Sequence, residues 1–446
     1  MGHRRRAGGS LVTADAPGAK AIAERPLSLA RRARGRYHCP AKTDCPQRTP
    51  MPPTPLALDL DRIALREIRL PLIEPFRISS GVVTERRILL LELRDADGLE
   101  MWAECVAGEQ PNYSPETIDT AWYAITTWIA PRVLGRPFDG PDAVRPELDR
   151  DFRGHSMAKA AVEMGCWALA AERAGMPLAR FLGGTQTAIL TGISLGIQAA
   201  PAALATRALA AKAAGYRKIK LKIKPGADVE YVAAVREAVG PEVALMADAN
   251  SAYALADADH LARLDAFGLT MLEQPLGRED LVQHAALQRR IATPICLDET
   301  ITDVDRARDM IALGSGRIVN IKPGRVGGFA SAIAIHDACQ SAGVPVWCGG
   351  MLESGVGRAY NVALASLPNF TLPGDLSPSA RYWERDVVTP EWTMDAEGLV
   401  AVPLERPGLG VTVDVDRIDD LTTRREVLTA PRSLAATAPE PGRADR

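Results

Sequence analysis

The chain has 446 residues, of which 47% are hydrophobic and 24% are charged, and its net charge is −2. This composition is typical of a globular protein with more than one domain, and the near-neutral charge argues against a nucleic-acid-binding protein. No apolar run approaches the ~18 residues of a membrane-spanning helix. The cysteines number seven and form no CxxC pair, which indicates reduced thiols in a cytoplasmic protein.

Residues 1–55 are rich in Arg, Ala, Gly and Pro and show neither a helical nor a strand period. Residues 1–50 hold eleven basic against three acidic residues, without the apolar segment of a secretory signal. We predict a disordered basic leader, with Met51 as an alternative start of translation. A targeting or nucleic-acid-binding arm is the less favoured interpretation.

Residues 56–186 are predicted to form an α+β domain. Two strands are expected at 62–73 and 82–94, and the second ends at a turn formed by Asp97-Gly98. Helical patterns then follow without intervening strands, as is typical of an α+β domain. These helices are expected at 115–133, 143–152 and 156–174.

Strands and helices alternate after Gly183-Gly184, and eight strands are predicted. This pattern favours a TIM-type (β/α)7β barrel over residues 187–388 rather than an open doubly wound sheet. The strands are expected at 188–198, 217–223, 243–248, 269–273, 293–298, 317–322, 344–348 and 369–373. The helices between them include 201–214, 228–238, 279–290 and 328–342. We expect residues 389–428 to return to the first domain and 429–446 to form a disordered tail.

Five of the predicted strands carry a charged residue at their last or next-to-last position, and these residues are 24 to 26 positions apart. They are Lys222, Asp248, Glu273, Asp298 and Lys322. One strand, one helix and two loops need about this length, given a crossover unit of ~30 residues. Because the carboxyl ends of barrel strands form the catalytic face, we expect these charges to surround one active site.

The three acidic residues of this set offer only oxygen atoms. Asp248, Glu273 and Asp298 would repel one another unless a cation held them together, and hard oxygen ligands select Mg²⁺ or Mn²⁺ rather than Zn²⁺. Each could instead cap the helix that follows its strand. Because all three acids stand at the same position, at the end of a strand, we favour the metal site.

The lysines of the strand at 217–223 alternate with apolar residues. Lys220 and Lys222 are therefore expected to point into the barrel, while the flanking Lys218 and Lys224 lie at the edges of the site. Repulsion, burial and a nearby metal ion would all disfavour their charged form, so that a lysine could act as a base. Lys322 would approach the ligand from the other side, and two lysines beside a metal-bound carboxylate suit removal of an α-proton.

The phrases KIKLKI, MADAN, EQP, CLDE and NIKPGRVGG, with GISLGI upstream and PVWCGGMLESGVGR downstream, resemble the enolase superfamily. The chain is most similar to its o-succinylbenzoate synthase / N-succinylamino acid racemase family, from about Leu58 to about residue 425. This resemblance implies that Lys222 and Lys322 are the acid/base pair and that Lys220 assists at the substrate carboxylate. It also implies that Asp248, Glu273 and Asp298 bind Mg²⁺.

The resemblance further implies a capping domain whose loops, Phe76–Gly81 and Glu104–Glu116, close over the barrel mouth. The expected substrate contacts are Phe76, Ser194, Gly350, Met351 and Leu352. Asn250 and Glu299 are expected to orient the ligands.

We therefore expect a Mg²⁺-dependent enzyme that dehydrates 2-succinyl-6-hydroxy-2,4-cyclohexadiene-1-carboxylate in menaquinone biosynthesis. Racemisation of N-succinyl- or N-acylamino acids is expected as a second activity. The alternatives are a dipeptide epimerase, a muconate-type cycloisomerase and a non-catalytic barrel that only binds a ligand. We expect a small carboxylate substrate, no nucleic-acid or membrane partner, a homo-oligomer and a cytoplasmic location.

Overall fold

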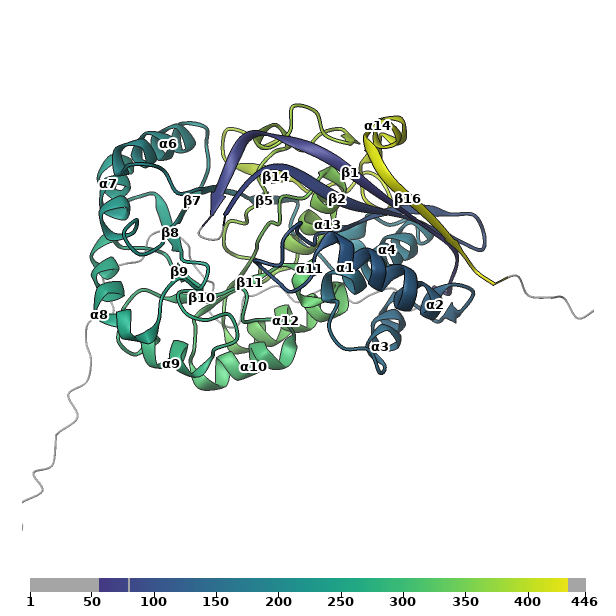
Figure 1. The fold of residues 1–446 in the computed structure, drawn as a ribbon, viewed down its shortest axis with the longest axis horizontal. Helices are drawn as coiled ribbons and strands as arrows, with labels where there is room; N and C mark the ends of the chain where they lie inside the picture. The colour runs from purple at the N-terminus through teal and green to yellow at the C-terminus, as the bar shows by residue number, and fades with distance from the viewer. Residues whose placement is uncertain (1–55, 79–80, 432–446) are drawn as a thin grey trace, which may run out of the picture. The chain divides into compact units, whose positions relative to one another are not determined.

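The computed structural model describes residues 56–78 and 81–431 (Figure 1). The predicted leader, residues 1–55, and residues 432–446 of the predicted tail lie outside the described residues. The predicted tail begins at residue 429, but Thr429 belongs to a strand and the amide of Ala430 donates to the carbonyl of Asp61 (2.8 Å). Within the described part of the chain, no helix has the length and apolarity needed to cross a membrane.

The first domain is built on an antiparallel sheet in which the strands follow the order β16-β1-β2-β3, with β4 paired to β1. The two predicted strands are present and are longer than expected. Asp95 accepts the amides of Asp97 and Leu99, and Gly98 has a φ of +87°, which glycine adopts without a steric cost. The strands are β1 (Leu58–Ile78), β2 (Gly81–Asp95), β3 (Glu100–Cys105), β4 (Pro137–Phe138) and β16 (Thr422–Thr429).

The helices of this domain follow the predicted ranges, with one interruption. Residues 125–129 form a π-helical turn, because Pro131 has no N–H to donate to the carbonyl of Thr127. All residues from Met157 to Ala171 are buried, since their helix lies between β2 and β3 on one side and α11 and α12 on the other. The helices are α1 (Ile118–Ala124), α2 (Ala130–Val133), α3 (Val144–Asp149), α4 (Ser156–Arg173) and α5 (Leu178–Phe181).

In the part of the chain that the structure describes, seven parallel strands form a curled sheet in the order β12-β11-β10-β9-β8-β7-β6 (Figure 1). The predicted barrel architecture with its capping domain is thereby confirmed. The strands are β6 (Gly192–Leu195), β7 (Lys218–Lys222), β8 (Ala244–Asp248), β9 (Leu272–Glu273), β10 (Ile295–Leu297), β11 (Ile318–Ile321) and β12 (Val346–Cys348).

The eighth predicted strand, 369–373, is not a regular strand in the structure. Phe370 forms a single bridge to Val346 on β12, and Gly374 forms one to Thr191 beside β6. This segment, which we call the ring-closing segment (residues 370–375), therefore spans the gap between the first and last strands of the sheet.

The first predicted barrel strand, 188–198, is also divided. Its first part, β5 (Ala188–Leu190), pairs with β14 (Leu399–Ala401), and only β6 belongs to the barrel. The remaining strands are β13 (Val388–Thr389) and β15 (Thr412–Val413). After α14 (Val415–Leu421), β16 pairs along β1, so the end of the described chain joins the first sheet.

Short helices cover the outside of the barrel sheet, and all four predicted ranges contain one. They are α6 (Pro201–Ala213), α7 (Val229–Val239), α8 (Ala258–Leu261), α9 (Val282–Gln288), α10 (Val304–Leu313), α11 (Pro323–Val326), α12 (Phe329–Ala342) and α13 (Gly355–Ala365). The faces that these helices turn inward are apolar, as in α7, whose Val232, Val235 and Val239 are buried.

Two buried carboxyl groups of the first domain bind the N-termini of barrel helices. Glu163 on α4 accepts the amides of Phe329 (2.7 Å) and Ala330 (2.8 Å) at the start of α12. Glu104 on β3 accepts the hydroxyl of Ser354 (2.6 Å) and the amide of Gly357 (3.0 Å) at the start of α13. Burial raises the pKa of Glu163 to about 7 and that of Glu104 to about 8. The two domains are thus joined by groups that titrate near neutrality.

Glu163→Gln should change how the stability of the protein depends on pH. The pKa of Glu163 is higher in the folded protein than in an unfolded chain, where it is about 4.3. The stability associated with this group is therefore fully present at low pH and is lost as the pH rises toward 7. The Gln variant loses one acceptor, so its deficit in unfolding free energy should be largest below about pH 4. By pH 8 that deficit should be smaller by a few kcal/mol, because each unit of difference between the folded and unfolded pKa corresponds to about 1.4 kcal/mol. Urea unfolding at several pH values measures this, and parallel pH profiles for the two proteins would contradict it.

Candidate active site

The charged residues predicted at the strand ends lie side by side at one end of the barrel sheet. Lys222 is paired in register with Asp248 on β8, which is paired in turn with Glu273 on β9. Asp298 and Lys322 directly follow β10 and β11. The three carboxylates have no exposed surface, and Lys220, Lys222 and Lys322 are also buried.

These side chains form a set of short ion pairs. Lys220 Nζ lies 2.9 Å from Asp248 Oδ2 and 2.7 Å from Glu273 Oε2. Lys222 Nζ lies 2.6 Å from the same oxygen of Asp248. Lys322 Nζ lies 2.8 Å from Asp298 Oδ2. The structure therefore brings together the residues that the spacing of the motifs predicted to share one site.

The pKa values of these groups are governed by the balance of burial and charge. Burial opposes ionisation of Asp248, but Lys220 and Lys222 outweigh it and lower the pKa of this carboxyl well below its usual range. Burial opposes the charged form of Lys220 too, yet Asp248, Asp375 and Glu273 raise its pKa well above the usual value. The pKa of Lys322 is also raised. In this structure the neighbouring carboxylates thus favour the charged form of Lys220, whereas repulsion and burial alone would disfavour it.

The three carboxylates are suitable in type, though not in arrangement, for a metal ion. Among the described residues, no three His, Cys, Asp or Glu side chains are placed to hold a metal together, because each carboxylate faces a basic side chain. Glu273 Oε2, although close to Lys220, accepts no well-directed hydrogen bond, and neither does the buried Asn320 Oδ1. A buried donor set made only of oxygen fits a hard divalent cation such as Mg²⁺.

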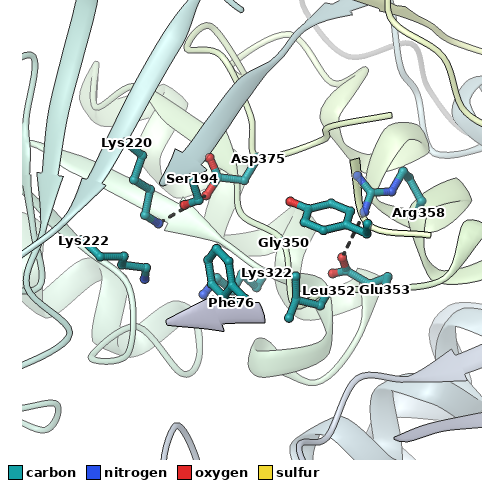
Figure 2. Close-up of a pocket in the computed structure, with 11 residues that line it drawn as sticks. Phe76, Ser194, Lys220, Lys222, Lys322, Gly350, Leu352, Glu353, Arg358 and Asp375 are labelled. Carbon is teal, nitrogen blue, oxygen red and sulfur yellow. Dashed lines mark hydrogen bonds and ion pairs between the residues drawn. The ribbon is translucent and has the colours of Figure 1, made fainter. Parts of the chain in front are cut away.

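A cavity of about 60 Å³ lies beside the lysines, and most of the predicted substrate contacts line it (Figure 2). Met351 is the exception among the predicted contacts: its amide donates to Glu353 Oε1 (2.8 Å), and it does not line the cavity. The lining residues are Phe76, Ser194, Lys220, Lys222, Lys322, Gly350, Leu352, Glu353, Arg358, Asp375 and Tyr382.

Comparison with known proteins identifies the family. Residues 62–183 match the N-terminal domain of mandelate racemase / muconate lactonizing enzyme, and residues 203–417 match the enolase C-terminal domain-like family. An o-succinylbenzoate synthase from Geobacillus stearothermophilus is 48% identical over 370 residues, which are 82% of this chain and 97% of that protein. The chain belongs to the enolase superfamily. The resemblance seen in the motifs is thereby confirmed.

Other members of the enolase superfamily are similar over nearly their whole length. An N-succinylamino acid racemase from Thermus thermophilus is 47% identical over 374 residues, which cover 83% of this chain and 99% of that protein. The crystal structure of a superfamily member from Listeria innocua superposes with a TM-score of 0.80 at 37% identity, covering 83% and 99% of the two chains. A hydrophobic dipeptide epimerase from Enterococcus faecalis is more distant, at 29% identity over 69% of this chain and 88% of that protein.

The two residues predicted to orient the ligands, Asn250 and Glu299, are hydrogen-bonded to each other, and Asn250 also contacts Lys222. Asn250 Oδ1 accepts a hydrogen bond from Lys222 Nζ (2.7 Å), and Asn250 Nδ2 donates to Glu299 Oε1 (3.0 Å). Asn250 has a φ of +42°, a conformation that asparagine tolerates better than most residues. The pair therefore fixes Lys222 from the side opposite to β6.

Three lining residues, Glu353, Arg358 and Tyr382, were not predicted from the sequence, and neither were four side chains that contact the charged residues. Tyr113, from the predicted lid segment, donates to Asp298 Oδ1 (2.9 Å) and accepts from Lys322 Nζ (3.1 Å). Arg325 binds the same oxygen of Asp298, and Asn320 Nδ2 donates to Glu273 Oε1 (2.8 Å). The fourth side chain is Asp375. Strand parity with Lys322 could have indicated Asn320, and the strand-end rule could have indicated Asp375, which follows the eighth predicted strand.

Proposed function

We propose that this enzyme removes the α-proton of a carboxylate substrate with the aid of Mg²⁺, and that it acts as an o-succinylbenzoate synthase. Racemisation of N-succinyl- or N-acylamino acids is proposed as a second activity. The observation that carries the proposal is that Lys222 and Lys322, from strands four positions apart in the sheet, line the same cavity. Relatives with each activity match almost their full length at nearly equal identity, which supports proposing both.

Each residue has a defined part in this proposal. Lys222 removes the α-proton, Lys322 stands on the opposite side of the carbon, and Lys220 lies beside the substrate carboxylate. Asp248, Glu273 and Asp298 would hold Mg²⁺, which stabilises negative charge on that carboxylate when bound. In the dehydration, Lys222 passes the proton it has taken to the departing hydroxyl group, so that water leaves. In the racemisation, one lysine removes the proton and the other returns a proton to the opposite face.

A comparison of kcat/KM for the cyclohexadiene acid and an N-succinylamino acid on the purified enzyme tests the proposal. Both substrates should be turned over in the presence of Mg²⁺. If neither reacts and a dipeptide is epimerised instead, the proposal is wrong and the more distant epimerase relative indicates the activity.

We also propose a cytoplasmic location and a homo-oligomeric state. Support for the location comes from the cysteines of the described residues, all of which are free and buried: Cys105, Cys166, Cys296, Cys339 and Cys348. Fractionation of cells tests the location, and light scattering of the purified protein tests the oligomeric state.

A further inference from the structure

A second group of charges surrounds Asp375, which lines the same cavity as the site lysines. Asp375 Oδ1 is 3.2 Å from Lys218 Nζ, and Asp375 Oδ2 is 3.2 Å from Lys220 Nζ. The hydroxyl of Ser194 lies 3.5 Å from the same Oδ2 (Figure 2). The Asp375 carboxylate thus contacts both Lys220, which has a proposed role in catalysis, and Lys218, which has none.

The barrel is built to hold Lys218 in this position. Its side chain is 1% exposed, and Nζ lies 3.6 Å from the centroid of the Trp347 ring, within the range of a cation–π contact. A Cβ on Gly192 would lie 2.6 Å from Lys218 Cε, so glycine leaves the room that this side chain needs. Lys218 is therefore held as an ion-pair partner of one oxygen of Asp375, while the other oxygen lies near Lys220.

The backbone also fixes Asp375. Its amide donates to the carbonyl of Cys348 on β12 (2.9 Å), and the carbonyl of Gly374 accepts from Gly192 on β6 (2.7 Å). The ring-closing segment thus places this carboxylate between the first and last strands of the sheet. Burial opposes its ionisation, but Lys218 and Lys220 outweigh it and lower its pKa to about 2. Asp375 is therefore charged at neutral pH.

Lys220 has three acidic neighbours, and two of them are the proposed metal ligands Asp248 and Glu273. Removal of the charge on Asp375 would leave the Lys220 ammonium attracted only to those two. Lys220 already lies close to the oxygens of both, and it would then compete more strongly with a cation for them, since buried charges interact strongly at such distances.

We propose that Asp375 is a positioning residue that attracts the Lys220 ammonium and so weakens its competition with Mg²⁺ for Asp248 and Glu273. This inference rests on the proposed function, because it assigns Asp375 a role toward the proposed metal ligands. Asp375 acts through Lys220 and need not touch the metal ion.

The test compares variants that differ in which of the charged groups around Asp375 they retain. Asp375→Asn alone would leave Lys218 buried without its counter-ion, which is strongly destabilising. The double variant Lys218→Met/Asp375→Asn has the same net charge as the wild type and avoids that cost. Lys218→Met alone is the matched control, and the triple variant with Lys220→Met removes the competing ammonium.

Titration of each EDTA-treated protein with Mg²⁺ in a calorimeter gives the first readout. Lys218→Met should bind Mg²⁺ within about threefold of the wild type, and the double variant about tenfold or more weakly than this control. The triple variant should regain the lost affinity. At saturating Mg²⁺, KM of the double variant for an N-succinylamino acid should rise more than kcat falls, because Lys220 no longer stays beside the substrate carboxylate.

Equal Mg²⁺ affinity of the control and the double variant would overturn the inference. It would also be overturned if the triple variant bound Mg²⁺ as weakly as the double variant, because Asp375 would then not act through Lys220. A wild-type protein that binds Mg²⁺ but turns over neither substrate would disprove the proposed function, and the titrations would still decide the role of Asp375.

Discussion

Glu273→Gln should lower kcat/KM by about 10³-fold or more while the protein stays folded, because it removes one of the charges proposed to hold the metal ion. Glu273 is fully buried, with Oε1 bound to Asn320 and Oε2 beside Lys220. Glutamine keeps the shape of this side chain and can still accept from Asn320. Its amide group cannot balance Lys220 or bind a divalent cation as a carboxylate does. Both turnover and Mg²⁺ affinity should therefore fall.

Glu279→Gln provides the matched control, since this glutamate follows the same strand but its side chain is 84% exposed. The control should keep its kcat/KM within about twofold of the wild type, as expected of a surface change. EDTA treatment of the wild type should abolish turnover, and added Mg²⁺ should restore it. Full turnover by metal-free protein would refute the metal-dependent mechanism.

Local sequence patterns determined most of the fold. Apolar runs ending in charged residues marked β7 to β11 correctly, because a strand buried on both faces needs continuous apolar residues. The range 188–198 was misjudged because its division depends on distant partners. The amide of Thr191 donates to Gly398 and that of Gly192 to Gly374, and no local pattern encodes these pairings. The same applies to 369–373, where isolated bridges replace a regular strand.

The residues of the site could be predicted where a single rule applies to each strand separately, namely that charged residues at strand ends face the active site. The strand-end rule selected the two lysines proposed to be catalytic and the three proposed metal ligands. The rule could not identify Tyr113, because this residue belongs to the other domain and contacts Lys322 and Asp298 only when the two domains are packed together. The rule also gives no basis for the raised pKa of Lys220. The repulsion between Lys220 and Lys222 is visible in the sequence, whereas the closer contacts of Lys220 with the carboxylates depend on distances in the folded barrel.

Lys322→Ala should abolish racemisation and yet allow one enantiomer of an N-succinylamino acid to exchange its α-proton in D₂O. Racemisation takes a proton from one face of the carbon and returns one to the other, so it needs Lys222 and Lys322 together. Without Lys322, Lys222 can still remove and return a proton on its own face. The fold should tolerate the change, because Asp298 keeps Arg325 as its cationic partner. Lys222→Ala should abolish both racemisation and dehydration.

The dehydration should respond differently to Lys322→Ala, because Lys222 can serve as the base for both of its proton transfers. The variant would lose only the positive charge near the reacting carboxylate, so kcat should fall by an amount equivalent to a few kcal/mol without disappearing. Lys224→Ala is the control, since Lys224 is two residues beyond Lys222 but exposed, and it should leave both reactions intact. Proton NMR of each enantiomer incubated separately with Lys322→Ala decides the matter. If both enantiomers exchange at equal rates, Lys322 is not the second base and the two-lysine mechanism is wrong.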